Sequence, residues 1–278
     1  MHHLLHRAQT LLAGVALLFA THTVWAQAPH TVFLEDLTWT ELRDLVHQGK
    51  TTILVPIGGT EQSGPYVALG KHNARVKVLS QRIAEGLGNA LVAPVIAYVP
   101  EGGTAPTTSH MRFPGTITVP DEVFKKTLES AANSFKVHGF QNIVFLGDHG
   151  GYQKDVQQVV ALLNKSWAST GATNGARAIV PEVYYSTSSD GYAQILRQHG
   201  IRDDEIGTHA GLADTALLLA VAPQMVRKEA MRSGPKVGQA DGVYGGDPRR
   251  ATAELGQLGI DAIVSKTVQA LKASTSAR

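Results

Sequence analysis

Short apolar segments that predict buried strands alternate along this chain with longer segments at helical spacing. The expected strands cover residues 51–58, 90–99, 141–151 and 176–185, and the expected helices cover 74–88, 121–139, 154–170, 209–223 and 247–274. Strands that alternate with helices of this length favour βαβ units, in which helices cover both faces of a mostly parallel sheet. The predicted fold class is therefore α/β.

The N-terminal segment, residues 1–26, is expected to be a secretory signal peptide. It has a basic start at Arg7, an apolar run over residues 11–20 and a small-residue cleavage pattern ending at Ala26. The apolar run is too short for a membrane span, although an uncleaved anchor is the alternative. We therefore expect residues 27–278 to form a single domain of an exported protein, periplasmic or secreted, with no membrane association after cleavage.

The composition narrows the chemistry that such a domain can use. The chain contains no cysteine, so any bound metal ion must be held by histidine and carboxylate side chains, and the core must hold without disulfides. Its 25 basic and 23 acidic residues give a formal net charge of +2, with no cluster of lysine and arginine. This near balance argues against a nucleic-acid partner.

Candidate metal ligands follow two of the expected strands. Glu61 comes after the first strand, and His149 lies in the glycine-rich segment GDHGG after the third. In parallel sheets, ligands bind beyond the carboxyl ends of the strands, so the two side chains can meet there. A turn at Gly64-Pro65 would bring His72 back to Glu61. Two imidazoles and one carboxylate suit a catalytic zinc ion, or iron or manganese, although a lone histidine after a strand is more often structural.

Five segments in order resemble the motifs of the creatininase family, the creatinine amidohydrolases and their relatives. They are PIGGTEQSGPYVALGKH, FPGTITV, GDHGG, HAGLADTALLLA and GDPRRATAELG. The resemblance runs over most of the chain beyond the signal peptide. It implies a three-layer α/β/α sandwich, metal-dependent hydrolysis of amide or ring C–N bonds in a small-molecule substrate, and a homo-oligomer of hexamer-like form.

The departures from the family pattern fall at its metal ligands. The family's first motif supplies a Glu, a His and an Asp to a two-metal centre, but here the His position holds Ser63 and the Asp position holds His72. A further motif histidine is replaced by Tyr66. In the family's H-A-G-E segment, the Glu is replaced by Leu212, and the later Glu becomes Asp214.

These changes are chemically consistent with the loss of one metal ion. An imidazole offers one lone pair to one metal and is a poor bridge between two. We therefore predict a mononuclear site, made of Glu61, His72 and His149, that holds one divalent metal per chain, with zinc favoured and manganese or iron as alternatives. The opposing hypothesis is a family member that has lost its metal altogether.

Three further residues are candidates for catalysis. His209 matches the histidine of the family's H-A-G segment and is the candidate proton shuttle. Asp214 follows it by five positions and could orient it. Asp148 precedes His149 and could act as a base or support that histidine, but the alternative interpretation is a turn residue.

Candidate substrate contacts lie in the first motif and in the long loop 101–119. Ser63 and Tyr66 are expected to face the space vacated by the lost metal. His110 and Arg112 are expected to close over the site from the loop, with Arg112 able to hold a substrate carboxylate. For Arg112, a salt bridge or a subunit contact is the alternative.

The predicted function is metal-dependent hydrolysis of a small cyclic amide or a related C–N bond, through bound water activated by the metal. A lactone or other ester could be opened by the same chemistry. The alternative from a different class is a non-catalytic family member that binds a small molecule or a protein partner.

Overall fold

The structure is a computed structural model that describes residues 30–169 and 175–276. The predicted signal peptide, residues 1–26, lies outside the described residues. Within the described part of the chain, no helix combines the length and the apolar character that a membrane crossing requires.

The centre of the fold is a sheet of four parallel strands in the order β2-β1-β3-β4. Its strands are β1 (Thr52–Ile57), β2 (Ala90–Val92), β3 (Asn142–Gly147) and β4 (Arg177–Ile179). Strands β1 and β3 pair along their whole length, from Thr52 with Asn142 to Ile57 with Gly147. The two central strands therefore end side by side, and the segments that follow them leave the sheet at the same edge.

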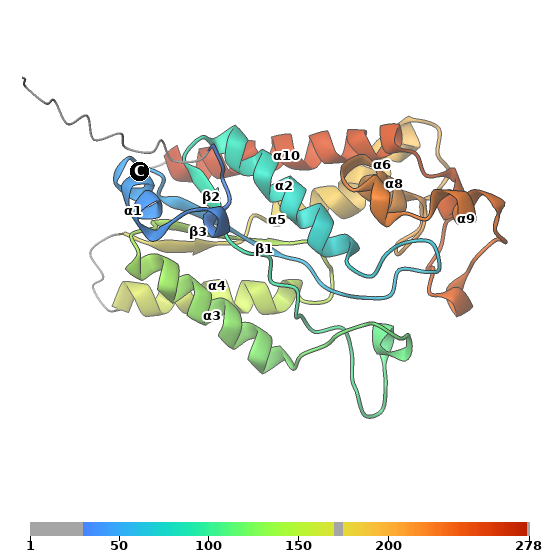
Figure 1. Ribbon diagram of the computed structural model, residues 1–278, viewed down its shortest axis with the longest axis horizontal. Coiled ribbons are helices and arrows are strands. Elements are labelled where there is room, and N and C mark those ends of the chain that lie inside the picture. Colours follow the sequence, from blue (N-terminus) through green and yellow to red (C-terminus); the bar gives the residue numbers. More distant parts are fainter. Residues whose placement is uncertain (1–29, 170–174, 277–278) are drawn as a thin grey trace, which may run out of the picture.

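Helices cover both faces of the sheet (Figure 1), which confirms the predicted three-layer α/β/α arrangement. The longest helices of the first layer are α2 (Lys71–Leu87), α8 (Leu212–Val221) and α10 (Ala253–Ser276), joined by α5 (Glu182–Ser186) and α6 (Tyr192–Gln198). The second layer holds α3 (Asp121–Val137) and α4 (Gln153–Ser169), and α1 (Trp39–His47) packs into the same core. Two short helices, α7 (Asp203–Ile206) and α9 (Lys228–Ser233), complete the described part.

Alternation along the strands explains the two layers. Successive side chains of a strand point to opposite faces. Thus Leu54 of β1 and Val144 of β3 lie in the core under α2, whereas Ile53 and Ile143 lie in the core under α3 and α4. All four are at most 1% exposed. Both faces of β1 and β3 are therefore apolar, as expected for a sheet buried on both sides.

Proline shortens two of the expected strands. The strand expected over 90–99 ends at Val92, two residues before Pro94, and the strand expected over 176–185 ends at Ile179, two residues before Pro181. Proline cannot donate a ladder hydrogen bond. Pro181 instead precedes α5, so the second half of that expected strand is helical.

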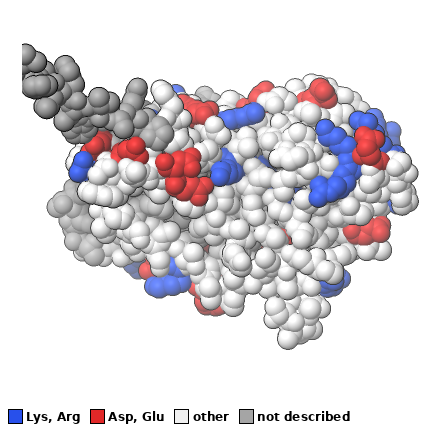
Figure 2. Space-filling view, viewed as in Figure 1, with Lys and Arg blue, Asp and Glu red and all other residues white. Residues whose placement is uncertain are grey.

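On the face shown in Figure 2, positive and negative side chains are interspersed, in keeping with the balanced composition.

Glycine lets α10 pack closely on α8, which carries one wall of the site described below. A Cβ atom at Gly256 of α10 would collide with the carbonyl oxygen of Ala216 on α8. The absence of a side chain at this position therefore sets how close the two helices can approach.

We expect Gly256→Ala to destabilise the protein, although alanine is the better helix former by about 1 kcal/mol. The collision with α8 should outweigh this gain and lower the free energy of unfolding by about 1–3 kcal/mol, as is typical of overpacked interiors. Urea unfolding followed by circular dichroism measures the change. Ser265→Ala, at an exposed position of the same helix, is the control and should leave stability unchanged. Equal stability of Gly256→Ala and wild type would contradict this account of the packing.

Candidate metal centre

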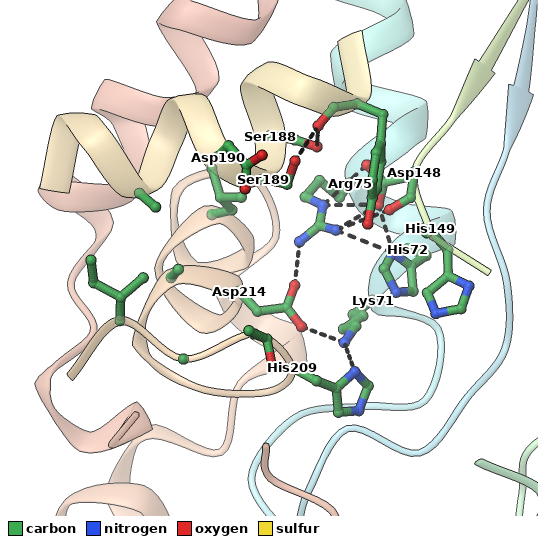
Figure 3. Close-up of a pocket in the computed structure, with 18 of the residues that line it drawn as sticks. Lys71, His72, Arg75, Asp148, His149, Ser188, Ser189, Asp190, His209 and Asp214 are labelled. Carbon is green, nitrogen blue, oxygen red and sulfur yellow. Dashed lines mark hydrogen bonds and ion pairs between the residues drawn. The ribbon is translucent and has the colours of Figure 1, made fainter. Parts of the chain in front are cut away.

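Five segments converge beyond the carboxyl ends of β1 and β3, and one of them is the long loop that carries Glu101 and His110. The loop after β1 carries Glu61, and the turn after β3 carries Asp148 and His149. The backbone N–H of Asp148 donates to the carbonyl oxygen of Ile57 at 3.0 Å, so the two segments stay paired as they leave the sheet. The first turns of α2 and α8 add the remaining charged side chains, which Figure 3 shows pointing toward one another.

Glu61 lies at the middle of the cluster and is fully buried. Its Oε1 atom accepts a hydrogen bond from His72 Nε2 at 2.8 Å and lies 3.3 Å from Lys71 Nζ. Its Oε2 atom has no hydrogen-bond partner among the described residues. That atom faces the ring nitrogens of His110 at 3.2 Å and His149 at 3.6 Å. The two oxygens of the Glu61 carboxylate therefore face two different environments. Oε1 lies beside Lys71 and His72, and Oε2 lies beside His110 and His149.

The environment around Oε2 has the composition of a metal site. Glu61, Glu101, His110 and His149 each offer one ligand atom, and these four atoms lie within 4.8 Å of one another. Both carboxylate oxygens of Glu101 are also buried without a hydrogen-bond partner among the described residues. Buried polar atoms are normally paired, so these three carboxylate oxygens beside two imidazoles are suited to hold a cation. Two nitrogen and two oxygen donors suit zinc or manganese.

Ionisation in this group favours metal binding at neutral pH. Burial lowers the pKa of His149 to about 4 and also lowers the pKa of His110, so both imidazoles are neutral and keep a lone pair for a metal. Burial, with the negative charge of Glu61 as the second cause, raises the pKa of Glu101 to about 9. Without a cation, Glu101 is therefore neutral, and a bound cation would favour its ionised form.

The environment around Oε1 is filled by protein cations. Lys71 Nζ donates to Asp214 Oδ2 and lies 3.4 Å from His209 Nδ1. Arg75 Nη1 contacts the other oxygen of Asp214 at 2.5 Å, and its Nε donates to Asp148 Oδ2 at 2.9 Å. Arg75 thus ties the end of β3 to the start of α8 through two carboxylates.

His72 completes this ionic network. Its Nδ1 lies 2.7 Å from Asp148 Oδ2, opposite the Nε2 that contacts Glu61. Burial and the charge of Lys71 lower the pKa of His72, but the two carboxylates outweigh them and the net shift is upward. Burial alone would raise the pKa of Asp214 and Asp148, but the neighbouring cations hold both values below the ordinary range.

Taken together, the network is balanced in charge. Its three cationic members face three carboxylates, and the six residues are Lys71, His72, Arg75, Glu61, Asp148 and Asp214. Figure 3 shows Asp214 between Arg75 and Lys71, and Lys71 in turn reaching His209. Buried charges are tolerated when each one is paired in this way.

A cavity of about 370 Å³ opens beside both environments. On one side it is lined by Lys71, His110, His149 and His209. The opposite wall comes from the segment Thr187–Gly191, which has π-helical geometry, and from apolar side chains of α7 and α8. His110 and His149 of the metal-ligand group and Lys71 therefore line one small pocket.

The structure places the expected ligands as follows. Glu61 and His149 belong to the group of possible metal ligands, and the turn brings His72 to Glu61 as expected. His72 itself is outside that group because both ring nitrogens already face carboxylates. His110, expected to contact substrate, instead lies among the possible ligands and also lines the cavity.

Three residues expected to contact substrate are placed differently. The described lining of the cavity does not include Ser63, Tyr66 or Arg112. The Tyr66 hydroxyl donates to the carbonyl oxygen of Pro235 at 3.0 Å, and Ser63 is buried against the carbonyl of Glu61. Arg112 is exposed and its Nε donates to Ser109 O within its own loop. Their hydrogen bonds to the backbone direct all three side chains away from the pocket.

Sequence reasoning missed Lys71, Arg75 and Glu101. The helix after the first motif begins at Lys71, three residues earlier than expected, so its first turn enters the site. Lys71 and Arg75 are spaced four apart, which places them on one helix face, and this spacing was the available signal. Glu101 opens the long irregular loop, where no periodicity indicates which side chains point inward.

Comparison with known proteins agrees with this architecture. The profile of the creatininase family, described as creatinine amidohydrolase, matches residues 35–271. The chain belongs to the creatininase family. Among characterised relatives, this member is 28% identical to the mycofactocin precursor peptide peptidase of Mycolicibacterium smegmatis, over 82% of this chain and 87% of the relative. It is 24% identical to the creatinine amidohydrolase of Pseudomonas putida, over 70% of this chain and 74% of the relative.

The solved structures show that the creatininase fold is shared. A crystal structure of creatinine amidohydrolase superposes with a TM-score of 0.72 at 23% sequence identity, covering 88% of this chain and 98% of the other. Solved creatininases include one described as Zn–Zn type and one described as creatininase Mn. This family member is thus an α/β protein of an amidohydrolase family whose solved structures carry zinc or manganese.

We expect Arg75→Met to be strongly destabilising because it leaves Asp148 and Asp214 buried with fewer partners. Breaking a buried ion pair from one side typically costs about 3–5 kcal/mol. Thermal and urea unfolding measure the loss. Lys77→Met removes an exposed cation from the same helix and should change stability by less than about 1 kcal/mol. Similar effects of the two substitutions would contradict the bridging role of Arg75.

The raised pKa of His72 predicts a pH dependence of stability. A histidine whose pKa is higher in the folded state stabilises fully below its ordinary value near 6.5, and this contribution disappears as pH rises through the raised value. The difference in unfolding free energy between wild type and His72→Gln should therefore be largest below about pH 6.5 and shrink at alkaline pH. Urea unfolding from pH 5 to 10 with a chelator present tests this. His47→Gln, an exposed change, is the control, and a pH-independent difference for His72→Gln would contradict the assignment.

Proposed function

We propose that this protein is a metal-dependent hydrolase of an amide or related C–N bond, with one divalent ion held by Glu61, Glu101, His110 and His149. The observation that carries this proposal is the set of buried carboxylate oxygens without partners, on Glu61 and Glu101, that face two neutral imidazoles. Family membership supports hydrolysis as the reaction class. The ligand set replaces His72 of the sequence prediction with Glu101 and His110.

A bound zinc or manganese ion supplies Lewis-acid activation of the scissile carbonyl and lowers the pKa of water to about 7. The protein's own contribution is to hold four donors in position and to limit the access of bulk water. His110 and His149 come from different segments. His149 follows β3 directly, and its backbone N–H donates to the buried Tyr152 hydroxyl at 3.0 Å, whereas His110 lies in a short 3₁₀ turn of the long loop.

The surroundings of His209 do not favour its predicted role as a proton shuttle. Lys71 donates toward its Nδ1, so the ring proton of the neutral imidazole lies on Nε2 and is donated to the carbonyl oxygen of Gln62 at 3.0 Å. Burial and the charge of Lys71 lower the pKa of His209 to about 3. At neutral pH, His209 is therefore uncharged, and its ring forms part of the cavity lining.

Asp148 and Asp214 contribute to the site through ion pairs with its cations. Each is bonded to Arg75, and each also holds a second cation, His72 or Lys71. Carboxylates engaged in this way are poor bases because their pKa values are lowered. We infer that both residues position the cations and do not accept a proton from water.

The cavity volume supports a small substrate, or the end of a larger one, as the bound group. The names of the relatives indicate two substrate types, creatinine for one and a precursor peptide for another. Both reactions break an amide-type C–N bond, and this is the bond class we propose here. We also propose that the protein acts after export, on the basis of the N-terminal signal pattern.

The proposal predicts about one zinc or manganese ion per chain in wild type, with binding lost or weakened at least tenfold in Glu61→Gln and Glu101→Gln. Loss of a metal ligand removes a donor that water replaces poorly. Mass spectrometry of metal content and a hydrolysis screen of cyclic amides, short peptides and lactones measure the two aspects. Glu229→Gln, at a side chain that is 90% exposed, is the matched control.

The outcomes separate the candidate functions. Metal binding with amide cleavage supports the proposal, and cleavage of lactones alone would shift the reaction to esters. Wild-type protein that binds neither zinc nor manganese after incubation with each ion would overturn the hydrolase assignment. It would leave a non-catalytic binding protein on the same fold.

A further inference from the structure

The ammonium group of Lys71 is surrounded by the kind of atoms that usually bind a metal ion. Its Nζ atom contacts Asp214 Oδ2, Glu61 Oε1 at 3.3 Å and His209 Nδ1 at 3.4 Å. The lysine side chain is 1% exposed. Two carboxylates and one imidazole around a single buried cation are the ligand types of a zinc or manganese site.

These three groups are held in place independently of Lys71. Asp214 also contacts Arg75 through its other oxygen and accepts from the backbone N–H of Ala210 at 3.0 Å. His209 donates to the Gln62 carbonyl, and Glu61 accepts from His72. Each group of the shell therefore keeps at least one other partner if the ammonium is removed.

Glu61 joins this shell to the candidate metal site. One of its oxygens contacts Lys71, and the other faces His110 and His149. In hydrolases with two metal ions, the ions lie about 3.5–4 Å apart and stabilise the attacking and leaving atoms together. Here one oxygen of Glu61 contacts an ammonium, and the other faces the proposed ligands of a metal ion.

We propose that the Lys71 ammonium permanently takes the place of a second metal ion, so that this protein works with one exchangeable metal and one covalently fixed cation. The inference rests on the proposed metal site for the first cation and goes beyond it by assigning the second position. It makes Lys71 a positioning residue that holds Glu61, Asp214 and His209 as a metal ion would.

An ammonium in this position differs from a metal ion in three ways. It cannot be removed by a chelator or exchanged. Its three N–H donors are matched by three acceptors, so it has no open position for water or substrate. It therefore supplies positive charge to the cavity wall, whereas Lewis-acid activation is left to the single metal ion.

The test is the number of metal ions bound by wild type, Lys71→Ala and a control, Lys77→Ala, an exposed lysine of the same helix. Each protein is purified, stripped with chelator, dialysed against zinc and analysed by mass spectrometry of metal content. We expect about one ion in wild type and in Lys77→Ala. We expect about two in Lys71→Ala, because the vacated shell of Glu61, Asp214 and His209 can hold the second.

A second measurement shows whether two bound ions are neighbours, which the metal content alone does not show. Manganese-loaded proteins are compared by electron paramagnetic resonance, in which two neighbouring ions couple and a single ion does not. Wild type should give the signal of an isolated ion, and Lys71→Ala should give a coupled pair. Zinc should also raise the melting temperature of Lys71→Ala more than that of wild type, since the ion replaces a lost cation.

The results test two proposals separately, the metal site and the replacement of a second ion by the Lys71 ammonium. Two ions in wild type, or one ion in folded Lys71→Ala, overturns the substitution of ammonium for metal but leaves the hydrolase proposal intact. Lys71→Ala that fails to fold both with and without zinc also overturns the substitution, because the ion should replace the ammonium. No ion in wild type overturns the proposed metal site itself, whereas one ion in wild type and two in the variant support both.

Discussion

The pairing of Arg75 with two carboxylates is the interaction on which the site depends. Its guanidinium lies between Asp148, at the end of a central strand, and Asp214, at the start of a helix in the adjoining layer. Without this cation, each acid would be buried with only one cationic partner, His72 for Asp148 and Lys71 for Asp214. Arginine is suited to this task because its planar group can bond two acids in different directions and stays charged when buried.

The fold and two of the site residues could be predicted because local sequence carries the necessary signal. Apolar strands bounded by glycine indicated a parallel sheet, and Glu61 and His149 follow its two central strands directly. The ends of adjacent parallel strands meet by geometry, so no knowledge of side-chain contacts was needed. Strand lengths were less predictable, since Pro94 and Pro181 end strand patterns that hydrophobicity alone would continue.

The rest of the site depends on contacts between residues far apart in sequence. His72 has the chemistry of a ligand, and only the position of Asp148, 76 residues away, shows that its second nitrogen is occupied. A lysine at a helix start is normally exposed, so burial of Lys71 could not be expected from its neighbours. The inward direction of Glu101 and His110 is set by an irregular loop, whose path no sequence period describes.

The buried carboxyl of Glu101 would make metal binding at the proposed site depend on pH. Without a cation, it retains its proton up to a pKa of about 9. An arriving metal ion must therefore displace that proton, and the reaction at neutral pH is an exchange of one cation for another. Low pH favours the proton in this competition and high pH favours the metal. Occupancy of the proposed site would therefore depend on both the metal concentration and the pH. If the protein is exported, as its N-terminal pattern predicts, metal loading at the proposed site would vary with the pH of the medium.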